Sequence, residues 1–60
     1  MDRDFSTYIR AARRRKGWSQ LRLGREADLD DSLISRVELG NREPTVAEFT
    51  RIEMALRGTF

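Results

Sequence analysis

The chain has 60 residues, 37% of them charged, and a formal net charge of +2. This length corresponds to one domain, residues 1–60, with a small core. The absence of cysteine and histidine excludes disulfides and thiolate metal sites and removes the usual zinc ligand and general base, so we expect neither an enzyme nor a cofactor.

The sequence shows no targeting or membrane segment. No apolar run approaches the roughly 18 residues that a membrane-spanning helix needs. The N-terminal residues MDRDF do not have the pattern of a signal peptide. We therefore expect a soluble, cytoplasmic protein that does not act on a membrane.

Basic residues are concentrated in the first part of the chain. Residues 1–25 carry eight Arg and Lys residues against two acids, a charge of +6, and residues 26–60 carry four Arg against eight acids, a charge of −4. A basic segment of this kind can follow the phosphate backbone of a nucleic acid. A solvated basic helix would show the same composition, so charge alone leaves both interpretations open.

Apolar spacing predicts a first helix from about Asp4 to Lys16, ended by Gly17. Its apolar face consists of Phe5, Ile9 and Ala12, with Tyr8 beside it. Residues 13–16 place four cations in the last turn, where the helix dipole favours positive charge. Phosphate contact is a second possible role for these cations and is compatible with the first.

Two short helices with a tight turn between them follow. Ser19 is a suitable N-cap for a helix that runs to about Ala27, and Asp30 for one that ends near Leu39, before a glycine. Asp28 stands where a left-handed residue would end the first of these helices. Aspartate tolerates that conformation better than most residues do, so we predict a positive φ at Asp28.

The two short helices divide into an inner and an outer face. The inner positions are Trp18, Leu23, Ala27, Leu29, Ile34 and Val37. Gly24 lies in a helix interior, where it costs up to about 1 kcal/mol relative to alanine, and this indicates that another helix crosses closely there. The outer face of the helix after Asp30 carries Asp31, Ser32, Ser35 and Arg36, with Leu33 at its edge.

Thr45 and Glu48 form a capping-box pattern at the start of a last helix. The apolar stripe of that helix consists of Val46, Phe49, Ile52 and Leu56, with Ala55 beside it, and residues 57–60 form a short tail. Short connections join all of these elements. The prediction is an all-α fold, a compact bundle of four short helices.

The segment Gln20–Leu39 resembles a helix-turn-helix unit. More specifically, residues 18–44, WSQLRLGREADLDDSLISRVELGNREP, are similar to the lambda-repressor/Cro-like family, also called XRE-type. The matching positions are Ser19-Gln20, Ile34-Ser35-Arg36, Glu38, Gly40, Arg42 and Pro44. The departures are Trp18, Gly24, Asp28 and Leu29, and the family's fifth helix is missing or reduced to a vestigial tail.

The resemblance implies that the helix from Asp30 to Leu39 lies in the major groove of DNA, with its N-terminal half against base edges. The base-reading candidates are then Asp31, Ser32, Leu33, Ser35 and Arg36. Arg36 could bind guanine through O6 and N7. Leu33 could touch a thymine methyl group or pack at the edge of the core. Asp31 could accept from a cytosine amino group or complement the helix dipole.

The resemblance also implies residues that hold the DNA backbone and the fold. The phosphate-contacting candidates are Ser19, Gln20, Asn41 and Arg42, and Gln20 is also expected to buttress the helix that ends near Leu39. The start of the helix at Ser19 offers free amides and the positive end of a dipole to an anion. Arg13 and Glu38 correspond to an ion pair of the family, which we interpret as structural.

The implied function is that of a sequence-specific transcriptional regulator of bacterial or phage origin that binds double-stranded DNA. We expect a repressor that occupies a palindromic operator as a homodimer, without a small-molecule ligand. Phe60, Leu39 and the exposed end of the last helix could form the dimer contact. The alternative is a protein-interaction module, such as an antitoxin with DNA-binding autoregulation. An antitoxin normally carries an extra segment to wrap its toxin, and none is visible here.

Overall fold

The structure is a computed structural model that describes residues 3–58. This part of the chain forms four helices and no strand. The helices are α1 (Arg3–Arg15), α2 (Gln20–Ala27), α3 (Asp31–Leu39) and α4 (Val46–Arg57). The predicted all-α bundle is therefore confirmed, and each helix begins and ends within about one residue of its predicted boundary.

Local capping chemistry sets the ends of α2 and α3. The Ser19 hydroxyl accepts the backbone N–H of Arg22 at 3.0 Å at the start of α2, and Asp30 caps α3 by accepting from Ser32. Asp28 ends α2 with a φ of 58°, the one positive φ at a non-glycine position among the described residues. The prediction of a left-handed Asp28 is confirmed.

The capping box at the start of α4 is also confirmed. The backbone N–H of Glu48 donates to the Thr45 hydroxyl at 3.1 Å, and the backbone N–H of Thr45 donates to Glu48 Oε1 at 2.9 Å. Both groups would otherwise lack a partner at the helix start, because the first amides of a helix have no carbonyl to bind. The capping box therefore fixes the side chain of Glu48 close to the loop between α3 and α4.

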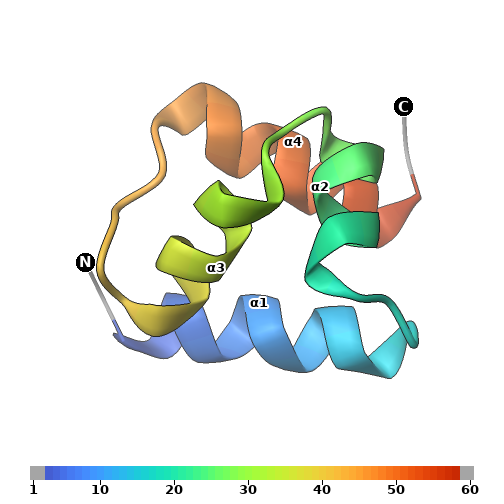
Figure 1. Ribbon diagram of the computed structural model, residues 1–60, viewed down its shortest axis with the longest axis horizontal. Coiled ribbons are helices and arrows are strands. Elements are labelled where there is room, and N and C mark those ends of the chain that lie inside the picture. The colour runs from blue at the N-terminus through green and yellow to red at the C-terminus, as the bar shows by residue number, and fades with distance from the viewer. Residues whose placement is uncertain (1–2, 59–60) are drawn as a thin grey trace.

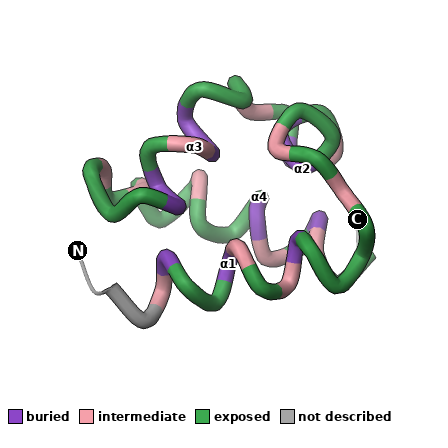
Figure 2. Tube along the Cα trace, turned by 60° about the horizontal axis from the view of Figure 1, so that its bottom comes forward, coloured by how far each residue is buried: buried purple, intermediate pink, exposed green. Residues whose placement is uncertain are grey.

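Helix α2 packs against both α3 and α4, and α1 packs against α3 (Figure 1). The buried residues of each helix lie on the side that faces the other helices (Figure 2). The core consists of Ile9, Leu23, Ala27, Ile34, Ile52 and Ala55, with Phe5, Trp18, Leu29 and Leu56 packed against it. None of the helices in the described range is long and apolar enough to cross a membrane.

Gly24 lies against the turn that links α2 to α3. A Cβ atom at this position would lie 2.6 Å from the carbonyl oxygen of Leu29 and 3.2 Å from the backbone nitrogen of Asp31. The expected close approach is therefore present. The nearest atom belongs to the turn, and the next nearest atoms belong to Asp31, the first residue of α3.

The predicted apolar stripe of α4 is wrong at its first position. Val46 is 84% exposed, while Ala55, placed beside the stripe, is fully buried. The buried positions Ile52 and Ala55 are one helical turn apart in the later half of α4, and Val46 is the first residue of the helix. Phe49, also predicted in the stripe, is 38% exposed, and its ring packs against that of Phe5 in α1, with 4.8 Å between the two centroids.

Candidate nucleic-acid interface

The outer face of α3 carries the polar residues that the sequence placed there. Asp31, Ser32 and Arg36 are exposed and Ser35 is half-buried. Leu33 is only 6% exposed. Of the two alternatives for Leu33, the structure shows packing in the core, because the inner face of α3 is wide and includes positions 33, 34, 37 and 38.

The N-terminal end of α3 is acidic. Asp30 accepts the backbone N–H of Ser32, and this hydrogen bond is the main cause of a lowered pKa of the Asp30 carboxyl. Asp31 lies in the first turn. Negative charge at this end of a helix is stabilised by the helix dipole. These carboxylates repel phosphates and offer only hydrogen-bond acceptors, so they suit a position near base edges better than one near the DNA backbone.

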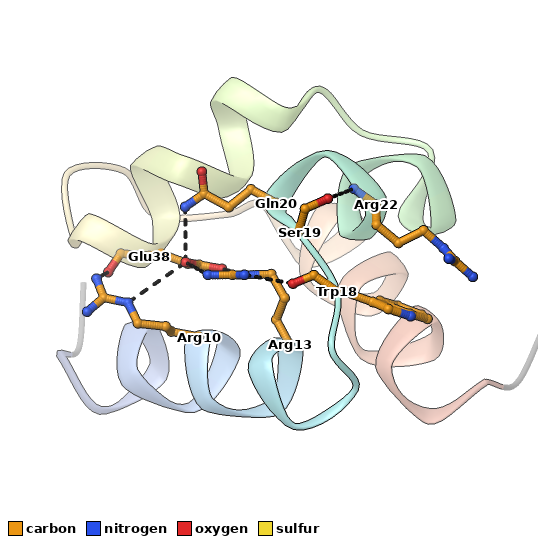
Figure 3. Close-up of polar contacts among 7 residues, drawn as sticks. All are labelled: Arg10, Arg13, Trp18, Ser19, Gln20, Arg22 and Glu38. Carbon is orange, nitrogen blue, oxygen red and sulfur yellow. Dashed lines mark hydrogen bonds and ion pairs between the residues drawn. The ribbon is translucent and has the colours of Figure 1, made fainter.

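Glu38 is the centre of a buried polar cluster between α1 and α3 (Figure 3). Its carboxylate accepts from Arg13 Nε at 2.6 Å and from Arg13 Nη2 at 2.9 Å. The exposed fraction of the side chain is 1% for Glu38 and 10% for Arg13. The hydrogen bond to Glu38 raises the pKa of Arg13, and Arg13 Nη1 also donates to the carbonyl of Trp18 at 2.8 Å. The pair therefore ties α1, the start of α2 and α3 together.

Gln20, the first residue of α2, belongs to the same cluster. Its Nε2 donates to Glu38 Oε1 at 3.1 Å, and its Oε1 points away from Glu38 (Figure 3). A carboxamide nitrogen has two N–H groups, so one donor remains for an anion at the start of α2. The hydroxyl of the neighbouring Ser19 is engaged as the N-cap of α2.

Arg10 is a member of the cluster to which the sequence assigned no role. Its Nη2 donates to the backbone carbonyl of Glu38 at 3.2 Å, and its Nε lies 3.8 Å from Glu38 Oε1. The side chain is partly exposed, so it adds positive charge at the surface close to Glu38, which Gln20 also contacts (Figure 3). The sequence feature that could have identified Arg10 is its three-residue spacing from Arg13, because residues three apart lie on one face of a helix.

The loop after α3 presents Asn41 and Arg42. Asn41 is exposed, and its backbone N–H donates to the carbonyl of Arg36 at 2.9 Å, which continues the end of α3. Arg42 forms an ion pair with Glu48, with its Nη2 3.1 Å from Glu48 Oε2. Gln20 is thus hydrogen-bonded to Glu38 in the later part of α3. Asn41 and Arg42 lie in the loop that follows the end of α3.

The remaining features of the described residues are their acidic side chains and a cavity between α1 and α4. No group of three or more acidic, histidine or cysteine side chains in this range could hold a metal ion. A shallow cavity of about 330 Å³ lies between α1 and α4 and is lined by Tyr8, Ala12, Arg15, Lys16, Leu56 and Arg57. It is lined by none of the candidates of α2, α3 and the loop after α3, but two of its residues, Arg15 and Lys16, belong to the cations for which phosphate contact is a possible role.

Comparison with known proteins agrees with the arrangement of α2 and α3. A helix-turn-helix family model matches residues 9–60, from Ile9 to the end of the chain. No curated protein and no solved structure matches the chain. The matched range includes the turn at Asp28, the outer face of α3 and the loop after it. The chain belongs to the lambda-repressor-like, XRE-type helix-turn-helix family of DNA-binding regulators.

Proposed function

We propose that this regulator recognises a specific base sequence through α3 and represses transcription by occupying an operator. The observation that carries the proposal is the outer face of α3, where Asp31, Ser32 and Arg36 are exposed beside Ser35. An α-helix fits the major groove, and polar side chains there can distinguish all four base pairs. Occupancy alone blocks a promoter, so the function needs no chemical step.

Arg36 is the side chain best suited to read a base. It is exposed, and no hydrogen bond or ion pair with any other residue between 3 and 58 engages its guanidinium group. Its planar fork matches O6 and N7 of guanine. Ser32 and Ser35 can bond to a base or a phosphate, and Asp31 can accept from a cytosine amino group or complement the helix dipole.

Two segments adjoining α3 would hold the DNA backbone. Ser19 and Gln20 stand at the start of α2, where backbone amides and the helix dipole favour an anion. Asn41 and Arg42 stand in the loop after α3. Contacts of this kind fix the register of the protein on the duplex and carry no sequence information.

We propose further that the protein binds a palindromic operator as a homodimer. Leu39, 63% exposed at the end of α3, and the exposed Val46 at the start of α4 support an apolar contact between two copies. Phe60, which the sequence also suggested for this contact, lies outside the described residues. Two copies related by a two-fold axis would place their α3 helices in major grooves about 34 Å apart.

Selection of bound sequences from a pool of random duplexes, at about 50 and 200 mM salt, tests the proposal. We expect a palindromic consensus at both concentrations and a steep loss of affinity at the higher one. A consensus without symmetry would refute the dimer on a palindrome. Recovery of the pool without any enrichment would refute sequence-specific recognition and favour a protein-interaction module.

A further inference from the structure

Arg42, proposed above as a phosphate contact, is already paired with a carboxylate of its own chain. Its Nη2 donates to both oxygens of Glu48, at 3.1 Å to Oε2 and 3.3 Å to Oε1. Both contacts use the same nitrogen, so this is an end-on contact and not the two-nitrogen fork that arginine can form with a carboxylate or a phosphate. The Arg42 side chain is 40% exposed, which leaves it accessible to an external anion.

Glu48 is held in place by contacts that do not involve Arg42. Its Oε1 accepts the backbone N–H of Thr45 at 2.9 Å as part of the capping box of α4. The carboxylate also lies in the first turn of α4, where the helix dipole favours a negative charge. Its side chain is 20% exposed, half the value of Arg42. Glu48 is therefore the fixed member of the pair, and Arg42, on the loop, is the member able to move.

The pair changes the charge that a DNA backbone would meet at this loop. Arg42 is the only cation between Gly40 and Thr45, and Glu48 neutralises it at contact distance. A phosphate that binds Arg42 must displace the carboxylate or bind next to it. Both alternatives weaken the contact, the first because an existing ion pair is lost and the second because two negative charges repel each other.

We propose that Glu48 competes with the DNA phosphate for Arg42 and thereby lowers the affinity of the protein for every duplex. The inference rests on the proposed role of Arg42 as a phosphate contact. Because phosphate contacts do not depend on base sequence, the competition acts on non-specific and specific binding alike. Glu48 thus sets the strength of backbone binding without touching DNA.

Glu48→Gln is the sharpest test, because glutamine keeps an acceptor for the capping box and removes the negative charge. Binding to a short duplex of arbitrary sequence should tighten roughly two- to five-fold at low salt, the range expected for loss of a partly exposed ion pair. The slope of log affinity against log salt should become more negative by up to about 0.9, equivalent to one more phosphate contact.

Glu53→Gln is the matched control, since it removes the same charge from α4, five residues further from the loop. It should leave the affinity and the salt slope close to the wild-type values. Arg42→Ala should weaken binding, and Glu48→Gln should give no further change in that background, which completes a double-mutant cycle. Thermal melting of each variant establishes that it is folded at the temperature of the assay.

Equal or weaker duplex binding by Glu48→Gln would overturn the competition; weaker binding would mean that Glu48 orients Arg42 for the phosphate. An equal gain in the Arg42→Ala background would overturn it too, because the gain would then come from general charge. If neither the wild type nor any variant bound duplex DNA, the proposed function itself would be refuted, and this inference with it.

Discussion

Replacing Glu38 by glutamine should destabilise the fold by about 3–5 kcal/mol, the usual effect of leaving a buried charge without its partner. The Arg13 guanidinium would stay buried and charged. Within residues 3–58, the Trp18 carbonyl is the only hydrogen-bond partner of the Arg13 guanidinium that does not belong to Glu38. A glutamine at position 38 offers one oxygen in place of two, and its NH₂ group would face either Arg13 or the amide of Gln20.

The magnitude follows from the two Arg13–Glu38 hydrogen bonds, at 2.6 and 2.9 Å, which are both buried. The Arg10–Glu38 ion pair adds little, because the Arg10 side chain is 41% exposed and pairs of that kind contribute less than about 1 kcal/mol. Native domains are stable by about 0.05–0.15 kcal/mol per residue, so roughly 3–9 kcal/mol for these 60 residues. The predicted loss is therefore comparable with the whole stability of the protein.

Urea unfolding followed by circular dichroism measures this effect. Glu26→Gln is a matched control, because Glu26 pairs with Arg22 on the surface of α2 and its loss should change the unfolding free energy by less than about 0.5 kcal/mol. Replacing both Arg13 and Glu38 by methionine should be less harmful than Glu38→Gln alone, since no buried charge is left without a partner and Arg10 is partly exposed. An unfolding midpoint for Glu38→Gln equal to that of Glu26→Gln would show that the pair is solvated.

Three further predictions concern single polar groups. Ser6 is buried, and its Oγ has no partner within the described residues, so Ser6→Ala should leave the unfolding free energy unchanged or raise it by about 1 kcal/mol; a clear loss would contradict this. Tyr8 donates to Glu53 at 2.6 Å, and this hydrogen bond raises the pKa of the phenol. The ultraviolet titration midpoint of this single tyrosine should therefore fall toward about 10 in Glu53→Ala, and equal midpoints would refute the effect. The hydrogen bond from Ser32 lowers the pKa of Asp30, so its stabilising effect is present above the ordinary aspartate pKa of about 4 and is lost as pH falls through the lower folded-state value. Asp30→Asn should lose less stability than the wild type over that acid range, whereas identical pH profiles would argue that the charge of Asp30 does not matter.

The helix boundaries could be predicted because the chemistry that sets them is local. Ser19 binds an amide three residues ahead of it, and Thr45 and Glu48 cap each other across one turn. The left-handed Asp28 follows from its place after Ala27 and from the steric tolerance of aspartate. These contacts depend on neighbours in the sequence, so a single chain contains the information.

Burial was harder to predict where it depends on packing between helices. Val46 fits the apolar period of α4, yet the period cannot show that the first turn of α4 lies outside the core. Leu33 is at the edge of the α3 stripe, where a small rotation of the helix decides between the core and the surface. Periodicity identifies which face of a helix is apolar. The packing of the neighbouring helices decides which residues of that face, and which residues at its edge, are buried.

The partners of the candidate site could not be read from spacing alone. Gln20 and Arg10 both reach Glu38, across 18 and 28 residues, and Arg42 binds a glutamate that the sequence assigned only to a capping box. Each of these side chains had several possible partners of opposite charge or suitable polarity. The tertiary fold selects among them. Sequence reasoning therefore identified Gln20 and Arg42 as site residues, assigned no role to Arg10, and did not predict Glu38 and Glu48 as the partners.

The most direct test of the central claim, that the outer face of α3 reads base pairs, is a binding comparison of the wild type and Arg36→Ala. The ligands are the selected operator and its single-base-pair variants. Arg36→Ala should lose about 1–3 kcal/mol of discrimination at one position of each half-site and keep the wild-type preference at the others. Arg42→Ala should weaken binding to all of these duplexes alike. Equal weakening by Arg36→Ala on every duplex would contradict the assignment of α3 as the reading surface.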